Sequence, residues 1–175
     1  MSRLIRNTLH CLIWLLLSHI MCLVLAFSFA ILPKNAMRYL GLLCCLITQV
    51  LLMGNCAVNI AKEHLALYRT ERIIVPKWEP AVMSLLTALP ALILYSLLWL
   101  MPDSVPYFNI YLLLNAPTVQ IINLIVQGKE TFGSLSAMQR LLMALLPLIP
   151  TLATLGGYLI HYPKHLAEEI AIREK

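Results

Sequence analysis

The charged residues of this chain are confined to short segments, and between them lie five stretches that contain no Asp, Glu, Lys or Arg. The stretches are 27, 23, 23, 25 and 23 residues long. Because a helix rises ~1.5 Å per residue, each is long enough to cross the ~30 Å hydrocarbon core of a bilayer. In chain order they are Asn7–Pro33, Tyr39–Ala61, Pro80–Pro102, Ser104–Gly128 and Leu141–Pro163. Hydrocarbon excludes charge, so this segregation predicts an all-α integral membrane protein.

The composition indicates one membrane domain. The chain is 61% hydrophobic and 12% charged, far below the ~25% charged content of soluble domains. No other segment is long enough for a soluble domain, so we predict a single polytopic domain over residues 1–175. Its net charge of +5 comes from residues that flank apolar runs, which favours contact with lipid headgroups over a nucleic-acid partner. The predicted embedded segments are about 8–32, 39–61, 81–101, 110–127 and 141–162.

The first apolar run has features of a signal sequence but is too long for one. Arg3 and Arg6 precede it, yet it far exceeds an h-region of ~7–15 residues, so we expect an uncleaved first helix. The sequence has no Asn-x-Ser/Thr acceptor and no lipidation box. We therefore expect the bacterial cytoplasmic membrane, with several crossings and a cytoplasmic N-terminus.

The fourth run is the least regular, because Asn115-Ala116-Pro117 interrupts it. It is either a broken spanning helix or a re-entrant element that returns to its starting side. With five crossings, eight Lys and Arg lie inside and five outside; with a re-entrant fourth run, the count becomes nine against four. The sequence thus predicts a compact bundle of four or five embedded helices, with the side of the C-terminus left open.

His19 lies near the middle of the first run, and ionisable residues at such depth are candidates for function. A proton-responsive or metal-binding site is one interpretation. We favour a neutral imidazole that hydrogen-bonds to a neighbouring helix, since a metal site needs further ligands. Candidate partners in the second run are Gln49, Asn55 and Asn59.

Two further groups of polar residues share helix faces. Asn55 and Asn59 follow Thr48 by 7 and 11 residues, which places all three on one stripe of the second helix. The first helix carries a stripe of small residues, and we predict that the two stripes pack the first hairpin together. In the fourth run, four amides form a candidate polar path or helix contact: Asn115, Gln120, Asn123 and Gln127.

Signatures of catalysis and of cofactor binding are absent from the sequence. It has no Gly-rich phosphate loop, His-Glu-x-x-His, Gly-x-Ser-x-Gly or Cys-x-x-Cys motif. No carboxylate lies inside an apolar run. The five cysteines, all in the first two runs, are interpreted as packing residues. We predict no enzymatic activity, no metal and no cofactor.

These observations favour an accessory or assembly subunit that packs its helices against another membrane protein. The partner is either a different membrane protein or a second copy of the chain. The alternative is a small oligomeric transporter or channel, with a polar path lined by amides of the second and fourth embedded helices. An embedded enzyme that uses His19 is a third, weaker hypothesis. The sequence identifies neither the partner nor a solute.

Overall fold

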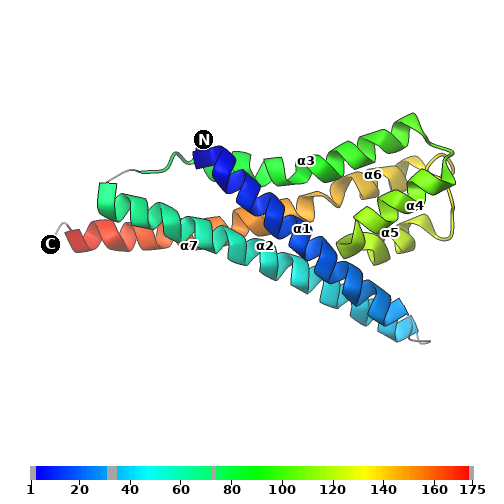
Figure 1. The fold of residues 1–175 in the computed structure, drawn as a ribbon, viewed down its shortest axis with the longest axis horizontal. Coiled ribbons are helices and arrows are strands. Elements are labelled where there is room, and N and C mark those ends of the chain that lie inside the picture. The colour runs from blue at the N-terminus through cyan, green and yellow to red at the C-terminus, as the bar shows by residue number, and fades with distance from the viewer. Residues whose placement is uncertain (1–2, 31–34, 72–73, 174–175) are drawn as a thin grey trace.

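The structure is a computed structural model that describes residues 3–30, 35–71 and 74–173. Within these ranges the chain is mainly helical and has no β-strand (Figure 1). In chain order the elements are α1 Arg3–Ala30, α2 Asn35–Glu71, α3 Trp78–Leu100, α4 Val105–Leu114, the 3₁₀ turn η1 Ala116–Thr118, α5 Val119–Val126, α6 Ala137–Leu145 and α7 Leu148–Arg173.

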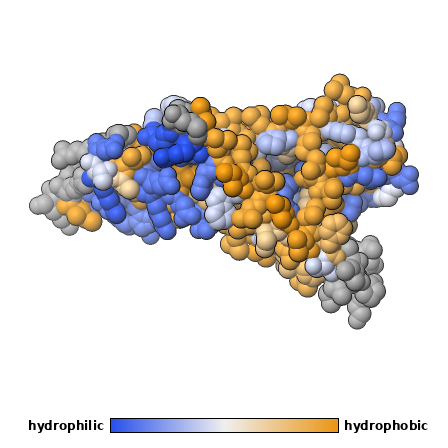
Figure 2. All heavy atoms as spheres, in the orientation of Figure 1, coloured by the Kyte–Doolittle hydropathy of each residue, from blue (hydrophilic) through white to orange (hydrophobic). Residues whose placement is uncertain are grey.

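Among the described residues, four helical segments are long and apolar enough to cross a membrane: Arg3–Phe29, Tyr39–Glu71, Trp78–Leu100 and Ala137–Ile172. The last contains the break between α6 and α7. Figure 2 shows an apolar belt with hydrophilic side chains gathered at the left end of the molecule and a smaller group at the upper right. The predicted all-helical bundle, with apolar helices compatible with several membrane crossings, is confirmed at this level.

Small side chains hold the α1–α2 hairpin together. Cys22 and Cys45 are buried, and each thiol donates to the backbone oxygen of the other residue, at 3.3 and 3.6 Å. Cys11 and Cys56 meet through their side chains, where the Cys56 thiol donates to the Cys11 sulfur at 3.7 Å. Because small residues let helix backbones approach closely, these cysteines act as packing residues, as the sequence predicts.

Two glycines bring α2 and α7 into close contact. A Cβ atom on Gly157 would lie only 2.6 Å from the carbonyl oxygen of Gly54. Further along the pair, Arg69 of α2 forms an ion pair with Glu169 of α7. The C-terminal ends of α2 and α7 therefore lie together, and the N-terminus lies on the same half of the molecule (Figure 1).

The loops at the other end join the two ends of the fourth run. The backbone N–H of Gly133 donates to the carbonyl oxygen of Pro102 at 2.7 Å. The Arg140 guanidinium donates to the Gly133 oxygen at 2.8 Å and lies 5.2 Å from the centre of the Trp99 ring. The segment before α4 and the segment after α5 thus both lie beside the C-terminal end of α3.

Between these two ends, the fourth run is sharply bent. α4 and α5 are bent by 90° at η1. The tip of this bend packs against the first hairpin, where Ala116 contacts Cys22 and Cys45. Gln127 and Gly128 adopt left-handed backbone conformations, with φ of 53° and 81°, and turn the chain after α5. The two ends of the fourth run therefore lie beside the C-terminal end of α3, and its middle reaches α1 and α2.

Candidate functional site

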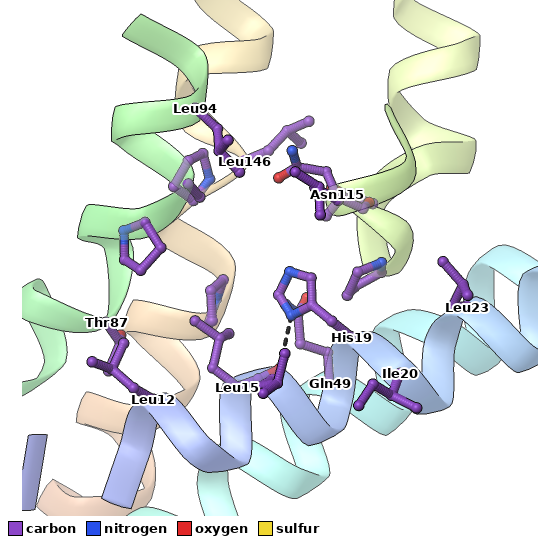
Figure 3. Close-up of a pocket in the computed structure, with 18 of the residues that line it drawn as sticks. Leu12, Leu15, His19, Ile20, Leu23, Gln49, Thr87, Leu94, Asn115 and Leu146 are labelled. Atoms are coloured by element: carbon purple, nitrogen blue, oxygen red, sulfur yellow. Dashed lines mark hydrogen bonds between the residues drawn. The ribbon is translucent and has the colours of Figure 1, made fainter. Parts of the chain in front are cut away.

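A cavity of about 500 Å³, here called the central cavity, lies among α1, α2, α3, the α4–η1 turn and the α6–α7 junction (Figure 3). His19, Gln49 and Pro90 line it, and each is near the middle of its charge-free stretch. The cavity therefore occurs at the level where the apolar helices are furthest from both hydrophilic ends. Its volume is within the ~300–1,000 Å³ typical of small-molecule sites.

Prolines interrupt the helices around the central cavity. Pro90, Pro117, Pro147 and Pro150 all contribute to its wall. Proline has no N–H to donate, so the helical hydrogen-bond pattern is broken close to the cavity in several elements. At the α4 break, the backbone N–H and the side-chain Nδ2 of Asn115 both donate to the Tyr111 oxygen. Irregular backbone at this depth is tolerated where protein or a cavity, rather than lipid, meets it.

His19 extends from α1 into the central cavity (Figure 3). Its Nδ1 lies 2.7 Å from the backbone oxygen of Leu15. A carbonyl oxygen only accepts hydrogen bonds, so Nδ1 carries the proton and Nε2 of the neutral ring is an acceptor. Nε2 has no partner among the described residues. The expected hydrogen bond to a neighbouring helix is therefore wrong: the partner is the turn of α1 that precedes His19.

Asn115 and Gln49 are the other two polar groups of interest in this wall. Asn115 uses its Nδ2 on Tyr111, which leaves its Oδ1 without a hydrogen bond in the described part of the chain. Gln49 is 2% exposed, and its Oε1 is buried with no partner. Figure 3 shows His19 and Asn115 extending toward the cavity from opposite sides. Acceptor atoms without donors thus gather in a cavity whose wall is otherwise mainly apolar.

The structure separates the other predicted site residues from this cavity. Thr48 and Asn59 are half-buried and Asn55 is exposed, and none of the three lines the central cavity. The small residues of α1 do face the hairpin partner, since Cys11, Ser18 and Cys22 are fully buried. The polar stripe of α2 does not face α1, because the hairpin contact uses Cys45 and Cys56 instead.

The amides of the fourth run are also dispersed. Gln120 and Asn123 line a separate cleft of about 300 Å³ with residues of α1 and α4. Gln127 is exposed at the left-handed C-cap of α5. Of the predicted polar residues, the central cavity therefore brings together His19, Gln49 and Asn115. In the described residues, no group of three or more His, Cys, Asp and Glu could hold a metal ion.

A second polar site, here called the Glu79 cluster, joins four helices at the N-terminal end of the bundle. It consists of Arg3, Asn7, His64, Glu79 and Tyr158. Arg3 donates from Nε and Nη2 to the two carboxylate oxygens of Glu79, at 3.0 and 2.6 Å. His64 contacts Asn7 at 2.9 Å through Nε2 and the Tyr158 hydroxyl at 2.7 Å through Nδ1. Glu79 is only 4% exposed and His64 only 1%.

The hydrogen bonds of the Glu79 cluster favour a neutral His64. The Nδ2 of Asn7 is a donor, so Nε2 of His64 must accept and Nδ1 carries the proton. His64 lies in the extension of α2 beyond the charge-free stretch that ends at Ala61. Burial lowers the pKa of His64 to about 4, although the nearby Glu79 carboxylate acts in the opposite direction. If the ring carried a second proton, Nε2 of His64 and Nδ2 of Asn7 would both be donors and could not form a hydrogen bond.

We expect acid to destabilise the protein through His64. The unfolded chain has a histidine pKa of ~6.5, whereas the folded state holds it near 4, so the unfolded state binds the proton first. The contribution of His64 is complete above pH 6.5 and is lost as the pH falls from 6.5 towards 4, by up to ~1.4 kcal/mol per pH unit. The measurement is the free energy of unfolding in detergent against pH. His64→Gln, the control, should lack this slope; parallel curves for the two proteins would contradict the assignment.

The Glu79 cluster was not predicted from the sequence, although a signal for it exists. Glu79 directly precedes the third apolar run, and Arg3 lies four residues before Asn7, where the first run begins. Both lie in charged segments that flank the apolar runs, so depth does not single them out. With the two run ends on one side of the bundle, opposite charges at their edges could have suggested a buried pair. No protein-family model, curated protein or solved structure matches this chain.

Proposed function

We propose that this chain is a multi-pass membrane protein that acts without catalysis, as an accessory or assembly subunit packed against another membrane protein. The observation that supports this role is the position of Asn55 on the outside of α2. Its side chain is exposed, and it lies one turn from Leu51, which is 64% exposed. Asn55 has no hydrogen-bond partner among the described residues.

The depth of Asn55 makes this exposure informative. It lies seven residues before Lys62, the first charged residue after the run, which corresponds to roughly 10 Å along a helix. In hydrocarbon, a polar group without a partner costs several kcal/mol. An amide in contact with a polar group of another helix instead gains ~0.6–2 kcal/mol. The best occupant of this face is therefore a transmembrane helix with an amide or hydroxyl side chain at the same depth.

The positions of the loops support a specific topology. The two ends of the fourth run meet through Gly133 and Pro102, so we infer that α4, η1 and α5 form a re-entrant element and that four segments cross the membrane. This arrangement places nine Lys and Arg on the side of the N-terminus and four on the other side. The positive-inside rule then orients both termini to the cytoplasm.

A subunit role is favoured over a channel by the positions of the polar side chains. Asn55 faces outward, Asn115 lines the central cavity, and Asn123 lines a separate cleft. These amides do not surround one path within a single chain. A channel would require several copies to bring them together.

Replacing Asn55 should weaken the proposed complex. The measurement is native electrophoresis of the tagged chain after mild solubilisation of its own membranes. We expect a complex larger than the free chain, and Asn55→Leu should weaken it by about 3- to 30-fold, which corresponds to the ~0.6–2 kcal/mol of an interhelical amide bond. Asn55→Gln, which keeps the amide, should retain most of the complex.

Leu51→Ala is the matched control, because it changes the same exposed face without removing a polar group. It should weaken the complex less than Asn55→Leu does, because only packing is lost. The purified chain in liposomes then distinguishes a different partner from a second copy. The role would be refuted if the chain migrated alone from its native membranes, or if Asn55→Leu and Leu51→Ala gave the same pattern.

A further inference from the structure

We propose that the central cavity binds an uncharged, mainly apolar molecule through a hydroxyl group, as in a long-chain alcohol or a glycerolipid with a free hydroxyl. This site is independent of the outward-facing Asn55. The inference combines three properties of the cavity: its volume, its apolar wall and the hydrogen-bonding state of the polar atoms in that wall.

The polar atoms of the cavity specify a hydrogen-bond donor. Leu15 fixes the proton of His19 on Nδ1, so Nε2 can only accept. Asn115 donates from Nδ2 to the Tyr111 backbone oxygen, which uses one of its two amide protons, and its Oδ1 is an acceptor with no partner in the described part of the chain. Gln49 adds a further acceptor, Oε1, which is buried with no partner, beside the donor Nε2 of the same amide. A hydroxyl group donates to such atoms, whereas an ether or a hydrocarbon does not.

The rest of the wall specifies an apolar body. Leucine, isoleucine, proline and alanine side chains make up most of the lining. None of the described residues that line the cavity is Asp, Glu, Lys or Arg. An anion or cation would therefore lose its hydration without a compensating charge. An apolar chain has no such hydration to lose, and it reaches the cavity through the bilayer. A cavity of about 500 Å³ accommodates a chain together with its hydroxyl group.

The hydroxyl groups of the two threonines in the cavity wall do not satisfy these acceptors. Thr87 donates to the backbone oxygen of Ser84 at 2.6 Å, and Thr118 donates to that of Asn115 at 3.3 Å. Their protons are therefore used within their own helical segments. They are therefore not available to Nε2 of His19, and a hydroxyl group of a ligand can donate to it.

Photolabelling tests this assignment with two probes. One is a long-chain alcohol that carries a diazirine in its chain, and the other is its methyl ether. The purified chain, reconstituted in phosphatidylcholine vesicles, is irradiated with each probe, and the labelled peptides are mapped by mass spectrometry. We expect the alcohol to label the cavity segments of α1 and the α4–η1 turn about 2- to 13-fold more than the ether, since a hydrogen bond contributes ~0.5–1.5 kcal/mol.

His19→Leu should abolish the preference for the alcohol while labelling by the ether persists. Gln49→Leu should also reduce the preference for the alcohol over the ether. If His19→Leu does not fold, Gln49→Leu replaces it in the test. Ser28→Leu is the matched control: Ser28 also bonds to its own helix, through the Val24 oxygen, but it is exposed and does not line the central cavity. Equal labelling by the two probes, or labelling of the cavity no stronger than that of the outer helix faces, would overturn the proposal.

Discussion

Gly157→Ala is expected to lower the free energy of unfolding by about 1–3 kcal/mol, although alanine forms helices better than glycine. The added Cβ would lie 2.6 Å from the carbonyl oxygen of Gly54 and 2.9 Å from its Cα. Both contacts are with backbone, so no side-chain rotation relieves them. α2 and α7 would have to separate, and the packing of neighbouring buried residues such as Ala57 and Tyr158 would be lost with them.

Gly156→Ala provides a control at the adjacent residue of the same helix. A Cβ on Gly156 meets no atom within 4 Å, so the change adds helix propensity alone, worth up to ~1 kcal/mol in a helix interior. The two variants should therefore shift stability in opposite directions. The measurement is unfolding in mixed micelles with increasing denaturing detergent. If both variants stabilise the protein, the close approach of α2 and α7 at Gly54 is wrong.

The positions of the helices follow from charge alone, whereas their contacts do not. The charge-free stretches predict α1, α2 and α3 because hydrocarbon and water impose opposite compositions. The same reasoning could not decide the fourth run, since Ser104–Gly128 is long enough to span but carries Pro117 in its middle. In the structure the two ends of this run meet through a loop contact between Gly133 and Pro102, and neither residue has a sequence pattern that identifies its partner.

The site was predicted in pieces. Depth singled out His19, and the proline break singled out Asn115, but their convergence on one cavity depends on where the α4–η1 turn meets α1. The sequence also could not predict which side of α2 carries Asn55, the side facing α1 or the outside. Thr48, Asn55 and Asn59 do share one stripe, yet helical periodicity gives only their relation to one another. Whether that stripe faces α1 or the outside depends on which residues of α2 let α1 approach most closely, and these are cysteines.

Arg3→Met is expected to destabilise the protein by about 2–3 kcal/mol. It would leave the Glu79 carboxylate, which is 4% exposed, without the two hydrogen bonds that now compensate for its burial. Breaking one partner of a fully buried pair typically costs ~3–5 kcal/mol. The expected loss is smaller here because the Arg3 side chain remains 29% exposed and is screened by solvent.

Arg6→Met tests whether this loss is specific to the Glu79 cluster. Arg6 pairs with Glu63 at 3.3 Å, but the two side chains are 61% and 55% exposed, so removing the pair should change stability by at most ~0.5 kcal/mol. The double variant Arg3→Met/Glu79→Gln removes the unpaired charge and should recover most of the stability lost in Arg3→Met. Recovery would show that the buried carboxylate, rather than the lost packing of the arginine stem, dominates the effect. Equal losses in Arg3→Met and Arg6→Met, or no recovery in the double variant, would contradict a buried ion pair that ties α1 to α3.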